Sequence, residues 1–119
     1  MGRLPPPPAA DWISQLRRGV LELCILQVLR RDASYGYEIV TTLAGLGPLA
    51  AGENTVYPLL RRLKADGILE TFTRESPAGP PRLYYRLTVE GRRRLATLER
   101  EWTSMVAAVE ESSRIGERS

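Results

Sequence analysis

Residues 53–69 read ENTVYPLLRRLKADGIL, and this stretch predicts an amphipathic helix. Pro58 lacks a backbone N–H, so it is tolerated only in the first helical turn, where N–H groups have no acceptor within the helix. We therefore expect the helix to begin near Asn54 or Thr55, which are both good capping residues, and to end at Gly67. The inward face follows the i, i+3, i+4, i+7 spacing and consists of Val56, Leu59, Leu60 and Leu63.

The opposite face of this predicted helix carries polar and basic side chains. Tyr57 and Arg61 are i, i+4 neighbours, Asn54 and Thr55 lie at the tip, and Arg62 lies alongside. Hydroxyl groups bond phosphates, Asn pairs with adenine, and Arg recognises guanine or a phosphate. These residues therefore suit contact with DNA; the alternative is an ordinary solvated helix face.

The residues around this helix predict five further elements and hence the fold class. Asp11 and Ser34 are good N-caps for two upstream helices. Downstream, apolar and polar residues alternate in two stretches joined by the turn-forming sequence ESPAGPP, which predicts a hairpin. The expected elements are helices at 11–31 and 35–46, strands at 68–74 and 82–88, and a long helix at 89–113. This order predicts a mostly α protein with a two-stranded β-wing: a winged helix-turn-helix plus a long C-terminal dimerisation helix.

The domain organisation follows from these elements. Four consecutive prolines near the N-terminus favour an extended conformation without a helix. We expect a disordered Pro-rich arm over residues 1–10, a winged helix-turn-helix over 11–88, a dimerisation helix over 89–113 and a frayed tail over 114–119.

Two helices indicate a homodimer. Within residues 20–29, eight of ten residues are apolar, so the first helix must be buried on more than one side. A second subunit would supply that burial, although a fully buried central helix of a monomer is the rival interpretation. The last helix has apolar residues at spacings of 3, 4, 3 and 4, which is a coiled-coil seam. The predicted dimer interface is Leu95, Leu98, Trp102, Met105 and Val109.

Composition excludes several classes of function. The chain has 119 residues, no histidine and one cysteine, Cys24. A His-based catalytic triad, a His general base and a Cys-rich metal site are therefore excluded, and we expect neither an enzyme nor a metal or other cofactor. No apolar run approaches the roughly 20 residues that span a bilayer, so we expect a cytoplasmic protein without membrane contact. The net charge of +3 is compatible with a polyanionic partner.

Four motifs, taken together and in order, resemble the PadR family of bacterial transcriptional regulators. They are LRRGVLELCILQVL (16–29), SYGYEI (34–39), ENTVYPLLRRLKADGIL (53–69) and RLYYRLTVEG (82–91). The resemblance is to the small members with a single C-terminal helix. It implies a homodimeric repressor that binds a palindromic operator in double-stranded DNA and dimerises through its first and last helices.

The resemblance also implies positions of DNA contact. Tyr35, Tyr37, Asn54, Thr55 and Tyr57 fall where the family contacts DNA, and Gly36 would allow a close approach of the chain. The family's wing often carries several basic residues before the tyrosine pair, whereas this wing has one, so its contact should be weaker. The complete set of predicted DNA-binding residues is Ser34, Tyr35, Tyr37, Asn54, Thr55, Tyr57, Arg61, Arg62 and Arg82.

Small members of the family also respond to small molecules. Trp102 is similar in position to a tryptophan that faces its dimer mate and sandwiches a flat ligand. We therefore predict a small planar hydrophobic effector contacted by Trp102, Leu16, Leu23 and Val106. The alternative is that Trp102 only packs the dimer seam. For the whole protein, the alternative function is a winged-helix protein-interaction module that does not recognise a DNA sequence.

Overall fold

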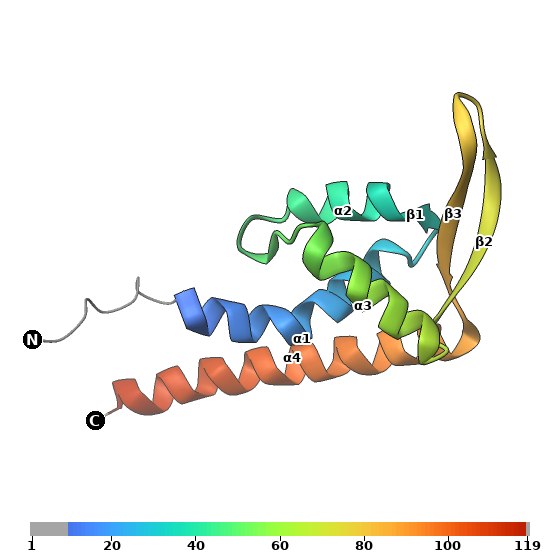
Figure 1. The fold of residues 1–119 in the computed structure, drawn as a ribbon. Helices are drawn as coiled ribbons and strands as arrows, with labels where there is room; N and C mark the ends of the chain where they lie inside the picture. The colour runs from blue at the N-terminus through green and yellow to red at the C-terminus, as the bar shows by residue number, and fades with distance from the viewer. Residues whose placement is uncertain (1–9, 119) are drawn as a thin grey trace, which may run out of the picture.

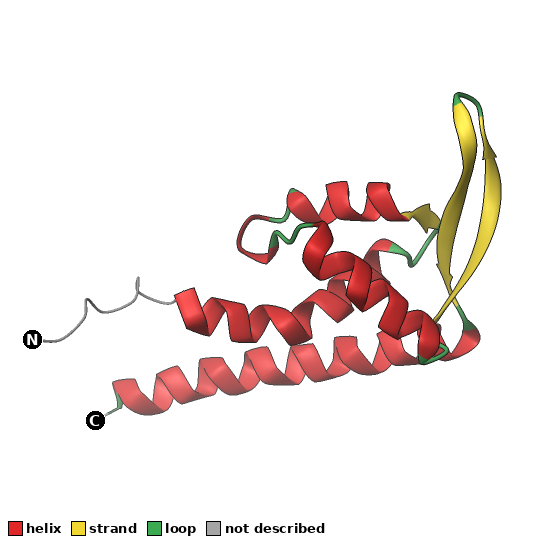
Figure 2. Ribbon diagram, in the orientation of Figure 1, coloured by secondary structure: helices red, strands yellow, loops and turns green. Residues whose placement is uncertain are grey.

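The computed structural model describes residues 10–118, which form a mostly helical fold with a small antiparallel sheet (Figure 1, Figure 2). The Pro-rich arm predicted for residues 1–10 lies, except for Ala10, outside the described residues. None of the helices within this range is both long and apolar enough to cross a membrane. The elements are α1 (Ala10–Val28), β1 (Ser34–Tyr35), α2 (Gly36–Ala44), η1 (Gly47–Leu49), α3 (Glu53–Ala65), β2 (Leu69–Ser76), β3 (Gly79–Leu87) and α4 (Val89–Glu117).

The sheet has three strands rather than the expected two, in the order β1–β3–β2. The additional strand, β1, is two residues long and pairs antiparallel with the base of β3, with Ser34 opposite Tyr85. So short a strand has no alternation to detect in the sequence. β2 and β3 form the wing (Figure 1). Because β2 ends at Ser76 and β3 begins at Gly79, the loop expected over residues 75–81 is shortened to a tight turn.

The starts of the helices differ from the expected ones. α3 begins at Glu53 with Gly52 as its N-cap, so Pro58 lies beyond the first turn and does not mark the start of the helix. α1 begins at Ala10, which places Asp11 inside the first turn. α2 begins at Gly36, and Ser34 is a strand residue instead of its cap.

Two glycines set the junctions that lead into and out of the wing. Gly67 ends α3 as predicted: its φ is 77°, and the N–H of Ile68 donates to the carbonyl of Leu63 at 2.9 Å. At the start of α4, the Thr88 hydroxyl accepts a hydrogen bond from the N–H of Gly91 at 2.9 Å. A Cβ on Gly91 would lie 2.2 Å from the carbonyl oxygen of Ile68, so α4 can approach the base of the wing only with glycine there.

The hydrophobic core lies where α1 meets the other helices and the inner face of the sheet. α1 packs against both α2 and α4, which bury it on several sides within one chain. The apolar part of α1 is therefore covered within one chain and does not require a second subunit for its burial, whereas a dimer contact through the rest of α1 stays a prediction. The side chains of α1 that are buried in this way are Leu21, Leu23, Cys24, Ile25, Leu26 and Leu29.

α4 consists of a packed part and an exposed part. Leu95 is 5% exposed and belongs to the core, so its assignment to a dimer interface is wrong. Leu98 packs against that core but is only partly buried, so its contact with a partner stays a prediction. Beyond them, Trp102, Met105 and Val109 are exposed. The helix continues to Glu117, so the frayed tail expected from residue 114 is wrong as far as residue 117.

Candidate nucleic-acid interface

One face of α3 presents polar side chains to solvent. Asn54 and Arg61 are exposed, and Tyr57, which lies between them, is half-buried. Spacings of three and four residues place all three in one row along the helix. Within the described part of the chain, Arg61 has neither an ion pair nor a side-chain hydrogen bond, so its donors are available to a ligand.

Tyr57 is held in this row by a close contact with α2. A Cβ on Gly36 would lie 2.6 Å from Cε1 of Tyr57 and 3.2 Å from its hydroxyl oxygen. Glycine at this position therefore allows α2 to pack closely on α3, and a close approach of DNA to Gly36 stays a prediction. Tyr37, one residue further along α2, is 64% exposed and is therefore not a core residue.

A tyrosine-lined groove of about 250 Å³ lies between α2, α3 and the wing. Tyr35, Tyr37, Tyr57 and Arg82 line it together with Tyr85, which is buried. Burial raises the pKa of Tyr85 above its ordinary value; the neighbouring Tyr57 raises the pKa further, and Arg61 lowers it. The groove therefore brings together hydroxyl groups and a guanidinium, which are donors suited to phosphate oxygens.

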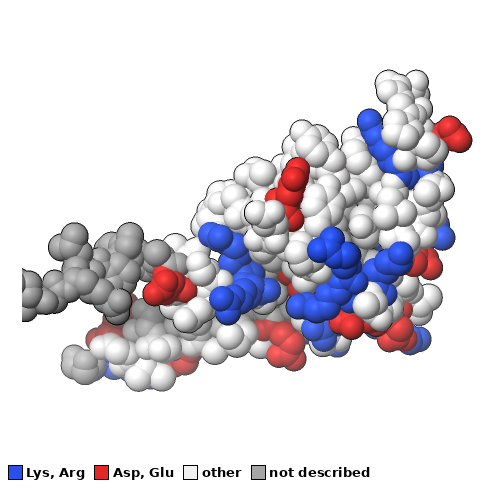
Figure 3. Space-filling model, in the orientation of Figure 1, with Lys and Arg blue, Asp and Glu red and all other residues white. Residues whose placement is uncertain are grey.

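The wing holds Arg82 at the edge of this groove. Its guanidinium carbon lies 4.4 Å from the centroid of the Tyr35 ring. Tyr35 in turn packs edge-on against Tyr84, with the ring centroids 5.5 Å apart. Figure 3 shows basic side chains over α3, over α1 and on the wing on this face of the molecule.

One predicted DNA contact, Ser34, is wrong, and a second, Arg62, is paired within the protein although its side chain is 58% exposed, so its contact with DNA stays a prediction. Ser34 is buried in β1, and its hydroxyl donates to the carboxylate of Glu38. Arg62 points toward α1, where its Nη2 lies 3.1 Å from Oε1 of Glu22. Thr55 is exposed, but it lines a hollow of about 360 Å³ with Arg62 instead of sharing a row with Arg61. Sequence reasoning missed Glu22, although a single acid inside an apolar helix stretch is the signal that could have found it.

Of the four residues predicted to contact an effector, one is buried in the core and three are partly exposed. Leu23 is 6% exposed and lies in the core, so a ligand cannot reach it and that assignment is wrong. Leu16, Trp102 and Val106 remain partly exposed on α1 and α4. Contact between these three residues and a ligand stays a prediction.

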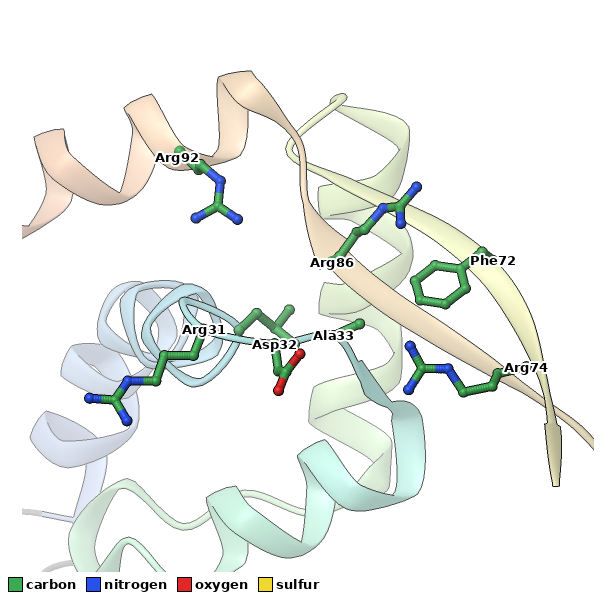
Figure 4. Close-up of a pocket in the computed structure, with 8 residues that line it drawn as sticks. Arg31, Asp32, Ala33, Phe72, Arg74, Arg86 and Arg92 are labelled. Atoms are coloured by element: carbon green, nitrogen blue, oxygen red, sulfur yellow. The ribbon is translucent and has the colours of Figure 1, made fainter. Parts of the chain in front are cut away.

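A second hollow, of about 230 Å³, lies on the outer face of the sheet (Figure 4). Phe72 lies at its wing side, and the guanidinium carbons of Arg74 and Arg86 are 5.4 Å and 4.6 Å from the centroid of that ring. Arg92 reaches toward the hollow from α4. Strand alternation places Arg74 and Arg86 on the same face of the wing as Arg82, opposite the face that carries Tyr85. The guanidinium carbon of Arg74 lies 4.3 Å from the centroid of the Tyr84 ring, which packs against Tyr35 at the edge of the tyrosine-lined groove.

The fold and the exposed face of α3 define a winged helix-turn-helix protein of the DNA-binding class. The comparisons with known proteins agree. A family model described as the transcriptional regulator PadR-like family matches residues 25–97. The chain belongs to this family, as its four motifs predicted, and is therefore a transcriptional regulator and not an enzyme.

Solved structures of regulators share this fold. A Streptococcus transcriptional regulator is 38% identical, and the match covers 81% of this chain and 94% of that one with a TM-score of 0.74. A PadR family transcriptional regulator from Eggerthella lenta is 37% identical, with coverages of 87% and 89% and a TM-score of 0.76. Bacillus subtilis PadR, solved in complex with operator DNA, is 28% identical, with coverages of 66% and 45% and a TM-score of 0.60.

Proposed function

We propose that this protein is a dimeric repressor that binds a palindromic operator and is released from it by a small planar effector. The observation that carries the proposal is the row of Asn54, Tyr57 and Arg61 on α3, in which Arg61 has no acidic partner among the described residues. In winged helix-turn-helix proteins, the helix at this place in the fold enters the major groove. The similarity to Bacillus subtilis PadR, which was solved with operator DNA, supports the same use of α3.

The tyrosine-lined groove would hold the sugar-phosphate backbone beside the major groove. Tyr35 of β1, Tyr37 of α2 and Arg82 of the wing offer donors around this groove. Contacts of this kind fix the register of the protein on the duplex, whereas Asn54 and Arg61 would recognise bases. Because the wing contributes a single arginine to the groove, most of the specificity should come from α3.

A second copy of the chain would cover the exposed part of α4. Trp102, Met105 and Val109 recur at the spacing of a coiled-coil seam, and all three are exposed in the single chain. An exposed apolar row of this kind marks an interface with a partner. A twofold dimer built on α4 would present two copies of α3, which must lie about 34 Å apart to enter successive major grooves.

Trp102 is also the proposed site of effector contact. Its indole is 42% exposed, and Leu16 and Val106 offer further apolar surface on the same pair of helices. A flat ligand held between two copies of Trp102 would release DNA only if it bound more tightly to a dimer whose α3 helices were misplaced. Quenching of tryptophan fluorescence by candidate ligands tests this part of the proposal, with Trp102→Leu as the matched variant.

The central experiment is a fluorescence-anisotropy titration against the DNA upstream of the protein's own gene at two salt concentrations. We expect selective, salt-sensitive binding that Arg61→Ala weakens by about 1–3 kcal/mol if Arg61 contacts a base. Arg93→Ala is the matched control, because Arg93 lies on α4 and pairs with Glu90. Equal affinity for unrelated DNA, or equal losses in the two variants, would contradict the proposed function.

The alternative function, a protein-interaction module, predicts a different outcome. Such a module would show no sequence-selective DNA binding at either salt concentration, and the tyrosine-lined groove would meet a protein surface instead. Binding that is selective and has a steep salt dependence excludes this alternative, because counterion release from phosphates produces that dependence.

A further inference from the structure

A buried carboxylate joins the three helices that matter most to the proposed function. Glu22 of α1 is 8% exposed. Its Oε1 accepts a hydrogen bond from Nη2 of Arg62 on α3 at 3.1 Å, and its Oε2 accepts one from Nε of Arg94 on α4 at 2.7 Å. We call this arrangement the Glu22 junction.

The hydrogen bonds of the Glu22 junction restrain the relative orientation of the helices that they join. A carboxylate is buried at high cost unless it is paired and hydrogen-bonded, and two guanidiniums from different helices meet that requirement here. Charge-assisted hydrogen bonds of this kind are short and angle-dependent. The hydrogen bond to Glu22 and the charge of that carboxylate raise the pKa of Arg94.

Apolar packing alone leaves the direction of α3 less well defined. Val56, Leu60 and Leu63 bury the inner face of α3, but hydrophobic contact is non-directional. Arg62 lies on a different side of α3 from this apolar row, and its link to Glu22 restrains rotation of the helix about its own axis. Because Arg61 is the next residue along the chain, such a rotation would also move the exposed row.

We propose that Glu22 is a positioning residue for DNA recognition: the Glu22 junction sets the direction of α3 relative to α1 and α4, and so sets the half-site spacing that the dimer accepts. This inference rests on the proposed function, because it assumes a dimer that binds two half-sites. It assigns a role to Glu22 and Arg94, which lie away from the exposed face of α3. It also gives Arg62 a role other than direct DNA contact.

The chain offers a matched control for this proposal. Glu99 of α4 accepts hydrogen bonds from Arg30 and, at 3.2 Å, from Gln27. Glu99 therefore joins α1 to α4, as Glu22 does, but it does not touch α3. Replacing either acid by glutamine removes one negative charge. Glu22→Gln removes the ion pairs to Arg62 and Arg94, Glu99→Gln removes the ion pair to Arg30, and only Glu22→Gln disturbs the link to α3.

The test compares operators whose half-sites are separated by the natural spacing or by one base pair more or less. We expect the full-length wild-type protein to lose about tenfold or more in affinity when the spacing changes. Glu22→Gln should bind all three operators within about threefold of one another, with unchanged affinity for non-specific DNA. Glu99→Gln should keep the wild-type preference.

A second variant, Arg62→Gln, provides the test if Glu22→Gln does not fold. Arg62→Gln leaves Glu22 paired with Arg94, so the buried acid keeps a partner, and thermal unfolding of this variant should resemble that of the wild type. It should lose the spacing preference as Glu22→Gln does, and it decides the question if Glu22→Gln fails to fold. Retention of the preference in Arg62→Gln, or its equal loss in Glu99→Gln, overturns the role of the junction. Absence of operator binding by the wild-type protein contradicts the proposed function itself.

Discussion

Replacing Gly36 by alanine tests the contact that holds Tyr57 on the surface of α3. The added Cβ would lie 2.6 Å from Cε1 of Tyr57, so the ring must move. Overpacking of this kind costs about 1–3 kcal/mol. Alanine is favoured over glycine inside a helix by up to about 1 kcal/mol, but Gly36 is the first residue of α2, where the gain is smaller. We therefore expect Gly36→Ala to lower the free energy of unfolding by about 1–2 kcal/mol.

The assay is urea unfolding followed by circular dichroism for four proteins at one fixed concentration: wild type, Gly36→Ala, Tyr57→Ala and the double variant. In the Tyr57→Ala background the obstructing ring is gone, so Gly36→Ala should be neutral or stabilising by up to about 1 kcal/mol. The two substitutions should therefore couple by about 1–3 kcal/mol. An equal cost of Gly36→Ala in both backgrounds would refute the reasoning, because the cost would then come from the backbone and not from the ring.

Three further predictions concern stability. Leu95→Ala should lower the free energy of unfolding by about 2–5 kcal/mol in urea titrations, because Leu95 is a core residue, whereas Met105→Ala should mainly change the dimer dissociation measured by analytical ultracentrifugation. Gly91→Ala should reduce the thermal midpoint and should not be rescued by truncating a neighbouring side chain, because the Cβ meets a backbone carbonyl. Burial raises the pKa of Cys24 above its ordinary value of 9.0, so the folded state holds the proton longer than the unfolded state and stability should fall as the pH rises past about 9. Cys24→Ala should flatten that part of the pH–stability curve, and an unchanged slope would contradict the assignment.

Sequence reasoning succeeded wherever the signal was local. The inner face of α3 was predicted from its spacing, and its buried residues are Val56, Leu60 and Leu63. The end of α3 at Gly67 was predicted because glycine readily adopts a positive φ. The alternation over residues 82–88 holds at the base of the wing, where Tyr85 and Leu87 are buried, but not further out, where Leu83 is 45% exposed.

The errors have a different origin, because each depends on a partner far away in the chain. Ser34 is a strand residue because β3, some fifty residues later, pairs with it. Sequence reasoning also did not find the partner of Arg62, because Glu22 lies on α1, 40 residues away, and the link from Glu22 to Arg94 spans 72 residues. Leu95 follows the spacing of a dimer seam, yet the core of its own chain buries it. A heptad shows that a side chain needs cover but not which surface supplies it.

The sequence by itself therefore determined the family, the order of the helices and wing, and the row of Asn54, Tyr57 and Arg61 on α3, since periodicity, turn residues and motifs are local properties of a chain. Tertiary structure decided which charged groups remain available to DNA and which are used inside the protein. It also decided how α1 is buried and how Glu22 joins α1, α3 and α4. These features depend on the distances between segments that only folding brings together.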